Sequence, residues 1–425
     1  MSLTTGKIAE VMFESAIETH QEQMQLLPLA EFIEPDGAML QNSGNVIWRP
    51  VEQHAPIISG WDMTGEETGI IEETYPAILG TPSNDFVRQR VDDMRDKTFW
   101  ERRGRTSGRR QVSELNKLLA AAVTTQAGIF YRSDATSGYD FIAQAQAIMN
   151  ERQLEHTSRC FILNDRDQLT FSKDLAARQT LQGQPDATWR KGQIGNNVAE
   201  FDLYTSSSLP NLDGGADPAT TVTGNHSFAP EAGSVNTSTG IVTNVDYRSA
   251  TFVVADSSSY TVGDKVTFSN NGTTVKALGL EDKTNTGQAM TFTIVAISDA
   301  THITVYPKPI AADDSALTTL EKAYANVDTT ILNAATVNRV NIDASNKVNL
   351  FWDKSAVEII GGTIPANLFS QYDGMKILSE KMPNGQTMYM VYDGNIATMN
   401  FRYRLFTWYG ITIANPSNCG VAVTY

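Results

Sequence analysis

A run of short alternating β-segments in the middle of the chain is the feature that most constrains its fold. Segments such as SATFVVAD, DKVTFSN and AMTFTIVAIS follow one another at intervals of about 8–12 residues, with turn signals such as NNG between them. Apolar residues at helical spacing precede this block, and aromatic-rich strands follow it. The sequence therefore predicts an α+β chain of 425 residues that carries an inserted all-β domain at residues 221–342.

The first segment of the chain predicts an amphipathic helix. Thr4 or Thr5 can cap its start, and Pro28 follows its end. Its stripe at helical spacing is made of Ile8, Val11, Met12, Ser15, Ala16 and Thr19. A single helix cannot bury such a face against itself, so we expect it to pack on the rest of the chain or on another chain.

Two extended segments follow, and a long turn-rich tip lies between them. NVIWRPVEQ is interrupted by Pro50, GIIEETYPAIL forms the second segment, and HAPIISGWDMTGEET separates the two. This order predicts a two-stranded arm that projects from a body. A two-stranded arm is marginally stable alone and leans on a neighbour.

A long helix is predicted from Lys97 to Ala127, which would extend for about 45 Å at 1.5 Å per residue. Its second half, from Val112 to Val123, has apolar residues every three or four positions. Gly104 and Gly108 lie before that half, and each costs a helix on the order of 1 kcal/mol relative to alanine. We therefore expect a bend or a break at these glycines.

A cluster of arginines surrounds the same two glycines. A dense basic run usually indicates a site for phosphate, but the formal net charge of the chain is -15, so the field of the whole molecule repels nucleic acid. No aromatic residues alternate with the basic ones, as they do in single-strand binders. The arginines concerned are Arg102, Arg103, Arg105, Arg109 and Arg110.

Residue patterns of enzymes and metal sites are missing from the sequence. No nucleophile elbow, phosphate-binding loop or dinucleotide fingerprint occurs, and the five histidines stand singly without partners at ligand spacing. Cys160 and Cys419 lie in apolar surroundings that favour buried reduced thiols. No apolar stretch has the length of a membrane span. We expect no catalysis, no metal and no cofactor, and synthesis in the cytosol.

Several segments together resemble the major capsid (coat) proteins of short-tailed, double-stranded-DNA bacteriophages. NVIWRPVEQHAPIISGWDMTGEETG is similar to their projecting loop, and NDFVRQRVDDMRDKTFWERR to the approach to their spine helix. VGDKVTFSNNGTTVKALG and HITVYPKPIAADD resemble their inserted β-barrel. KAYANVDTTILNAATVNRVN, IPANLFSQYDGMK and RLFTWYGITIANPSNCGVAV resemble the remainder. The resemblance is collinear from Asn45 to Val423.

The resemblance implies the tailed-phage capsid fold with the following divisions. They are an N-terminal arm at 1–40, the E-loop and the start of the peripheral (P) domain at 41–85, and the spine helix at 86–128. The axial (A) domain has a first part with a flexible loop at 129–220 and a second part at 343–395. The inserted β-barrel (I-domain) occupies 221–342, and C-terminal strands at 396–425 close the body.

The same resemblance implies a structural coat subunit that forms the hexamers and pentamers of an icosahedral shell. The virion shell would assemble in the host cytoplasm as a scaffold-guided procapsid, and it would expand as DNA enters through a portal at one vertex. DNA would lie in the lumen without specific binding. Two alternatives stay open, namely a glycan-binding module of a phage particle and a nucleic-acid-binding protein that uses Arg102 to Arg110.

If the chain forms a shell, the five arginines can also contact a neighbouring subunit. They would pair with acidic groups of a neighbouring subunit, for which Glu66, Glu67, Glu72 and Glu73 of the projecting loop are the candidates. DNA contact and plain solvated surface are the other two interpretations. Gly104 and Gly108 become candidates for a hinge that bends during expansion.

Overall fold

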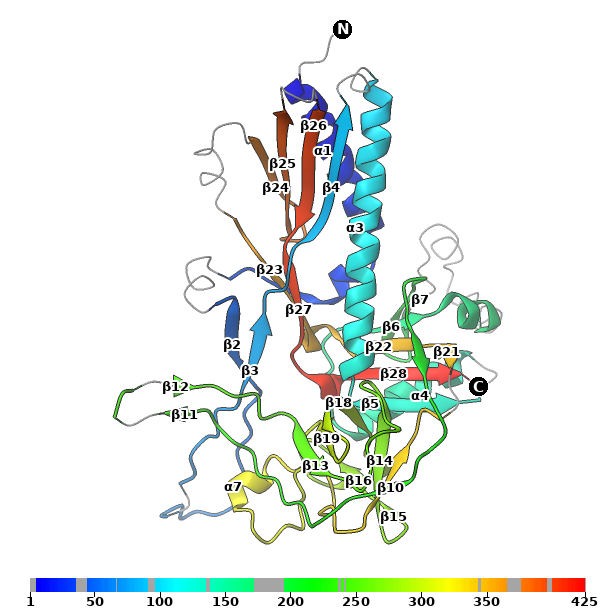
Figure 1. Cartoon of the computed structure of the whole chain (residues 1–425). Helices are drawn as coiled ribbons and strands as arrows, with labels where there is room; N and C mark the ends of the chain where they lie inside the picture. The colour runs from blue at the N-terminus through cyan, green and yellow to red at the C-terminus, as the bar shows by residue number, and fades with distance from the viewer. Residues whose placement is uncertain are drawn as a thin grey trace. The chain divides into compact units, whose positions relative to one another are not determined.

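The computed structural model describes residues 5–35, 44–65, 67–90, 96–134, 138–171, 195–235, 238–240, 242–342, 345–364, 376–395 and 400–424. Figure 1 shows the chain and its labelled elements. The chain divides into two compact units. Unit 1 comprises Met1–Ile47, Ala77–Leu119 and Glu358–Thr412, and unit 2 comprises Trp48–Pro76, Ala120–Val357 and Ile413–Tyr425.

A four-stranded antiparallel sheet forms the centre of unit 1. Its strand order is β24 (Lys376–Lys381), β25 (Thr387–Asn395), β26 (Asn400–Thr407) and β4 (Ser83–Arg90). Helix α1 (Thr5–Gln23) and the first part of α3 (Lys97–Gln126) belong to the same unit (Figure 1). Trp100 and six apolar residues of α1 share one core with the sheet residues Met388, Met390 and Leu405. The apolar face of α1 is therefore buried against its own chain.

The predicted break in the long helix is wrong. Helix α3 is one uninterrupted helix of 30 residues. A Cβ atom on Gly104 would lie 2.3 Å from the carbonyl oxygen of Met12, and one on Gly108 would lie 2.5 Å from that of Ala16. The two glycines are needed because the backbones of α1 and α3 approach too closely for any side chain. The sequence pattern gave no sign of this contact, because the partner helix lies some 90 residues away in the chain.

Unit 1 also contains a three-stranded sheet of β1 (Glu31–Ile33), β23 (Val357–Gly361) and β27 (Tyr409–Ile413). The predicted arm is present as a pair of strands, β2 (Val46–Pro50) and β3 (Thr74–Ile78), at the base of an extended loop (Figure 1). The described residues between those strands contain no helix or strand. The predicted arm of two extended segments with an irregular tip is confirmed.

A six-stranded mixed sheet forms the body of unit 2. Its order is β5 (Ile129–Ser133), β28 (Cys419–Thr424), β22 (Asn349–Asp353), β6 (Arg159–Leu163), β8 (Phe201–Thr205) and β7 (Gly195–Val198). Helix α4 (Gly138–Glu151) shares a core with these strands. The aromatic-rich strands that follow the β-block divide between the two units, since β22 joins this sheet while β25 and β26 belong to unit 1.

The two cysteines lie in that sheet. Cys160 of β6 and Cys419 of β28 both pair with Trp352 of the strand between them. Both thiols are free and buried, as predicted, and burial raises the pKa of each. Strands stand about 4.8 Å apart, so two residues separated by a whole strand are too distant for a disulfide.

The β-block of residues 221–342 forms its own sheet and core within unit 2. The order is β10 (Thr220–Thr221), β20 (Thr336–Arg339), β14 (Lys265–Asn270), β18 (Phe292–Asp299), β19 (His302–Tyr306) and β13 (Ala250–Val253), with β15 (Thr273–Thr274) paired to β14. Phe252, Phe268 and Phe292 are fully buried at its centre. The β-strands predicted for this block are present, and the block also contains one short helix, α7 (Thr319–Lys322).

Shorter elements complete the described structure. They are β9 (Asn211–Asp213) with β21 (Ser345–Lys347), β11 (Ser234–Val235) with β12 (Val242–Thr243), β16 (Lys276–Leu278) with β17 (Asn285–Ala289), α7 (Thr319–Lys322), and the 3-10 turns Leu27–Leu29, Lys354–Ala356 and Pro416–Asn418. No helix in the described part of the chain combines the length and the apolar character that crossing a bilayer requires.

A buried lysine joins the β-block to the end of α3. The Lys265 ammonium donates hydrogen bonds to the carbonyl oxygens of Thr124 and Ala127 and to the Thr293 hydroxyl, each at 2.9 Å. The last carbonyls of a helix have no partner inside it, and a cation also suits the negative end of the helix dipole. Burial lowers the pKa of Lys265 to about 7. The end of α3 is therefore capped by a side chain that is far away in sequence.

Candidate functional site

Of the five clustered arginines, Arg103 faces inward. Its Nη2 donates to both carboxylate oxygens of Asp85 at 2.8 Å, and its Nε donates to the Tyr403 hydroxyl at 2.7 Å. The Ser107 hydroxyl donates to the same carboxylate. Burial by itself would lower the pKa of Arg103, but the bond to Tyr403 and the charge of Asp85 outweigh it and raise the pKa. Arg103 is thus satisfied within its own chain.

The other four arginines are exposed on α3. Arg102, Arg105 and Arg109 are spaced three and four residues apart, so they form one stripe along the helix. Arg110 lies beside this stripe and lines a polar hollow of about 330 Å³ together with Asn84, Asp85 and Glu114. We call Arg102, Arg105, Arg109 and Arg110 the arginine stripe. It presents positive charge that the chain's own fold does not bury.

The four candidate carboxylates of the loop are not equivalent. Glu66 lies outside the described residues, while Glu67 and Glu72 are exposed. Glu73 is half-buried; burial raises its pKa, and the charges of Lys308 and Arg248 act in the opposite direction. Because Glu73 already lies among cations of its own unit, Glu67 and Glu72 are the described carboxylates that are open to an outside partner.

The tip of the loop exposes large apolar side chains together with these carboxylates. Ile57 and Trp61 are fully exposed, and Ile70 and Met63 are exposed to 61% and 41%. Single exposed apolar residues are common on protein surfaces, but here four of them lie within fourteen residues of one loop. The described chain supplies no cover for Trp61.

The base of the loop is fastened to the β-block by contacts that the sequence does not signal. The Tyr324 hydroxyl accepts a hydrogen bond from the backbone N–H of His54 at 3.1 Å and donates one to the carbonyl oxygen of Ile71 at 3.2 Å. One tyrosine therefore holds both legs of the loop. Nearby, the Arg248 guanidinium lies 4.7 Å from the ring centre of Tyr75. Tyr324 sits in the segment KAYANVD, which has no recognisable motif.

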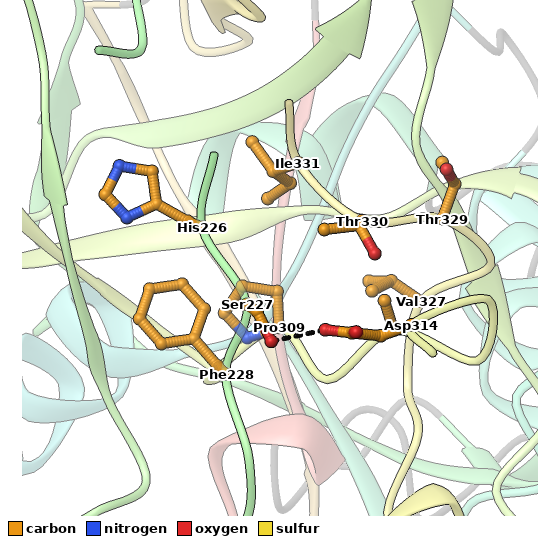
Figure 2. Close-up of a pocket in the computed structure, with 10 residues that line it drawn as sticks. His226, Ser227, Phe228, Pro309, Asp314, Val327, Thr329, Thr330 and Ile331 are labelled. Atoms are coloured by element: carbon orange, nitrogen blue, oxygen red, sulfur yellow. Dashed lines mark hydrogen bonds between the residues drawn. The ribbon is translucent and has the colours of Figure 1, made fainter. Parts of the chain in front are cut away.

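A pocket in the β-block brings a serine, a histidine and an aspartate together, but not as a catalytic triad (Figure 2). The Ser227 hydroxyl donates directly to the Asp314 carboxylate, and this bond lowers the pKa of Asp314. The His226 Nε2 lies 3.2 Å from the carbonyl oxygen of Thr223, and its ring stacks on Phe228. A triad needs the histidine between the other two side chains, so this arrangement stabilises the loop and cannot activate the serine.

Metal chemistry finds no support in the described residues either. No three His, Cys, Asp or Glu side chains of that part of the chain gather in a way that would hold a metal ion. What the described structure offers is therefore surface: a stripe of arginines on a helix and a projecting loop with apolar and acidic side chains. Surfaces of this kind serve protein–protein contacts.

Comparison with known proteins identifies what the chain is similar to. A family model described as "P22 coat protein - gene protein 5" matches residues 1–424. Solved structures with a similar chain include "Mycobacterium phage Che8" (9% identity, 94% of this chain and 91% of that one, TM-score 0.45). A second is "Capsid structure of the Cyanophage P-SCSP1u" (10% identity, 93% and 86%, TM-score 0.43). With TM-scores below 0.5, these structures add no weight to the family match.

Proposed function

The chain belongs to the P22 coat protein family and is a coat subunit of a phage capsid, and we propose that its copies form hexamers and pentamers of an icosahedral shell around double-stranded DNA. The observation that carries the proposal is the loop tip, where Ile57 and Trp61 are fully exposed. An apolar tip on a projecting loop gains stability only when a second copy covers it. In a closed shell every copy offers the same tip and the same receiving surface, so a modest contact is repeated many times.

The arginine stripe is the part of a neighbouring copy that we propose for the acidic side of the loop. Glu67 and Glu72 are exposed on the loop, and Arg102, Arg105, Arg109 and Arg110 are exposed on α3. Charge pairs of this kind set orientation and partner choice more than they add affinity. DNA contact by the stripe is the competing role, and the net charge of -15 opposes it.

The apolar side of the loop tip requires an apolar receiving surface. The outer face of the sheet in unit 1 has a hollow of about 400 Å³ lined by Phe86, Val391 and Phe406 together with Arg402 and Arg404. Phe86 is 67% exposed. We propose this hollow, with its apolar floor and its two arginines, as the seat for a tryptophan on an acidic loop.

The β-block supports a more specific proposal, namely that it is a closed barrel. The two ends of its sheet meet at an isolated antiparallel bridge between Val222 and Val254. The N–H of Thr223 donates to the carbonyl oxygen of Val253 at 2.8 Å, and the N–H of Ala255 donates to that of Thr221 at 2.9 Å. These bonds join the edge beside β10 to the edge beside β13, and closure removes edges that would otherwise aggregate.

The life cycle of the shell follows from the family resemblance as a further part of the proposal. A scaffolding protein guides a procapsid in the host cytoplasm, a portal occupies one vertex, and the shell expands as DNA enters. A wall with net negative charge leaves packaged DNA mobile, because like charges repel. A hinge at Gly104 and Gly108 stays part of this proposal, although close packing already accounts for both glycines.

Electron microscopy of the full chain tests the proposal directly. The chain is expressed with and without a candidate scaffolding protein, and the purified material is imaged in negative stain. We expect closed shells with the scaffold and irregular assemblies or free subunits without it. A protein that stays monomeric in both cases contradicts the proposal, and a DNA titration across salt concentrations then tests nucleic-acid binding.

A further inference from the structure

A buried histidine lies between the first helix and the rest of unit 1. His20, in the last turn of α1, is only 1% exposed. Neither ring nitrogen has a hydrogen-bond partner in the described part of the chain. Burial lowers the pKa of His20 from 6.5 to about 4. A buried polar ring without partners costs stability, so such a residue in a helix interface calls for an explanation.

The packing of α1 against α3 explains why the ring is so well covered. Gly104 lies against Met12, and Gly108 lies against Ala16, so the two helices advance together in steps of four residues. His20 follows Ala16 by four residues and continues the same contact line. The buried residues Gln111 and Val112 occupy the corresponding turn of α3.

The charged groups of both helices point away from this contact. On α1, the exposed side of the helix carries the carboxylates, and on α3 the charged residues of the facing turns are exposed or half-exposed. Burial of the ring is the physical cause of the lowered pKa of His20. The charged residues concerned are Glu10, Glu14, Glu18 and Glu22 of α1 and Arg109, Arg110, Glu114 and Lys117 of α3.

We propose that His20 makes the docking of α1 reversible by acid, so that protonation of the ring releases the helix from α3 and from the sheet. An imidazolium without an acceptor is unstable in this core, whereas in water it is fully solvated. Release exposes the apolar residues Ile8, Met12, Phe13 and Ile17, which can then bind another apolar surface. The argument uses contacts within unit 1 alone and holds whether or not the proposed shell contacts are correct.

The sign and size of the effect follow from linkage. His20 has a pKa of about 4 in the docked helix and of about 6.5 in the released helix. Docking is therefore unaffected above pH 6.5 and weakens as the pH falls from 6.5 toward about 4. Below that range both states carry the proton and the effect levels off. Between pH 7 and pH 5 the equilibrium constant for release rises about 20-fold.

Amide hydrogen exchange of the full-length protein, read by mass spectrometry, tests the proposal. Exchange of α1 is compared at pH 7 and pH 5 after correction for the intrinsic rates, with β22 of unit 2 as the internal reference. For the wild type we expect α1 to open about 20-fold more at pH 5 and β22 to stay unchanged. In His20→Leu, which keeps the apolar contact but cannot titrate, opening of α1 should not respond to this change of pH.

Two results would overturn the proposal. The first is an equal rise of α1 opening in the wild type and in His20→Leu, because the acid response would then belong to other groups. The second is no rise in the wild type. If His20→Leu does not fold, the nuclear magnetic resonance titration of the His20 ring in the wild type decides. A midpoint near 4 while α1 stays protected supports the proposal, and a midpoint near 6.5 with α1 still protected rejects it.

Discussion

At the scale of single residues, the cluster around Asp85 shows how one basic run divides into two kinds of arginine. Arg103 and its neighbours on α3 have the same chemistry, yet only Arg103 is turned toward Asp85 and Tyr403. The side chains of the pair are 22% and 16% exposed, so water screens their attraction only in part. Arg103 belongs to the fold of unit 1, and the arginine stripe is left for contacts outside the chain.

The residue-scale prediction concerns this pair. Arg103→Met should lower the free energy of unfolding by about 2 kcal/mol, because it leaves the Asp85 carboxylate partly buried without its cation. The change is measured by urea titration of the full-length protein, followed by intrinsic tryptophan fluorescence, to which Trp100 of the same core contributes. Arg105→Met is the matched control on the exposed stripe and should change stability by no more than about 0.5 kcal/mol. Equal effects of the two substitutions would contradict the division.

At the scale of elements, α1 and α3 form a helix pair whose closeness depends on two missing side chains. Helix propensity alone favours alanine over glycine by about 1 kcal/mol in the interior of α3. Packing reverses that preference, because any Cβ at Gly104 or Gly108 meets a carbonyl oxygen of α1 at 2.5 Å or less. Glycine at these two positions therefore lowers the helix propensity of α3 but allows α1 to pack closely against it.

The element-scale prediction follows from this reversal of sign. Gly108→Ala should destabilise the protein by about 2 kcal/mol, since α1 must shift away from α3 to admit the methyl group. Thermal unfolding and hydrogen exchange of α1 report the loss. Thr106→Ala, at an exposed position two residues away, serves as the control and should be close to neutral. A Gly108→Ala variant that is stabilised would show that propensity, and not packing, governs the position.

At the scale of the whole molecule, the chain exposes apolar and charged side chains that are suited to contacts with other copies. The loop tip is apolar and acidic, the arginine stripe is basic, and neither is covered by the described part of the chain. Exposed charge pairs contribute about 0.5 kcal/mol each in solution. Two such pairs per copy, one for Glu67 and one for Glu72, amount to about a fivefold change in each association constant, and a shell repeats that factor at every interface.

The molecule-scale prediction is a charge exchange between copies. The triple change Arg102→Glu, Arg105→Glu and Arg109→Glu should reduce the yield of shells at least about tenfold, because acidic loops then face acidic helices. Adding Glu67→Arg and Glu72→Arg should restore assembly. Shell yield is measured by sedimentation of purified assemblies. Normal assembly of the triple variant would show that the loop does not dock on the arginine stripe. Failure of the charge exchange to restore assembly would show that the partner of the stripe is not the loop.

Local pattern by itself determined much of this protein. The alternation of SATFVVAD and AMTFTIVAIS predicts the β-block, and the spacing from Val112 to Val123 predicts the long helix. Each signal lies within one segment, because side-chain periodicity follows from backbone geometry alone. Family membership could likewise be inferred from the order of such segments.

Contacts between distant segments were decided only by the tertiary structure. The sequence around Gly104 and Gly108 does not indicate that α1 packs there, and the sequence around Arg103 does not distinguish it from Arg105. Likewise, no local pattern predicts that Tyr324 bonds both legs of the loop or that the ring of His20 is buried. The residues that complete each site lie between 18 and 300 positions away in the chain. Sequence pattern reports what a segment can form, whereas the partner of a side chain is set when separate segments pack.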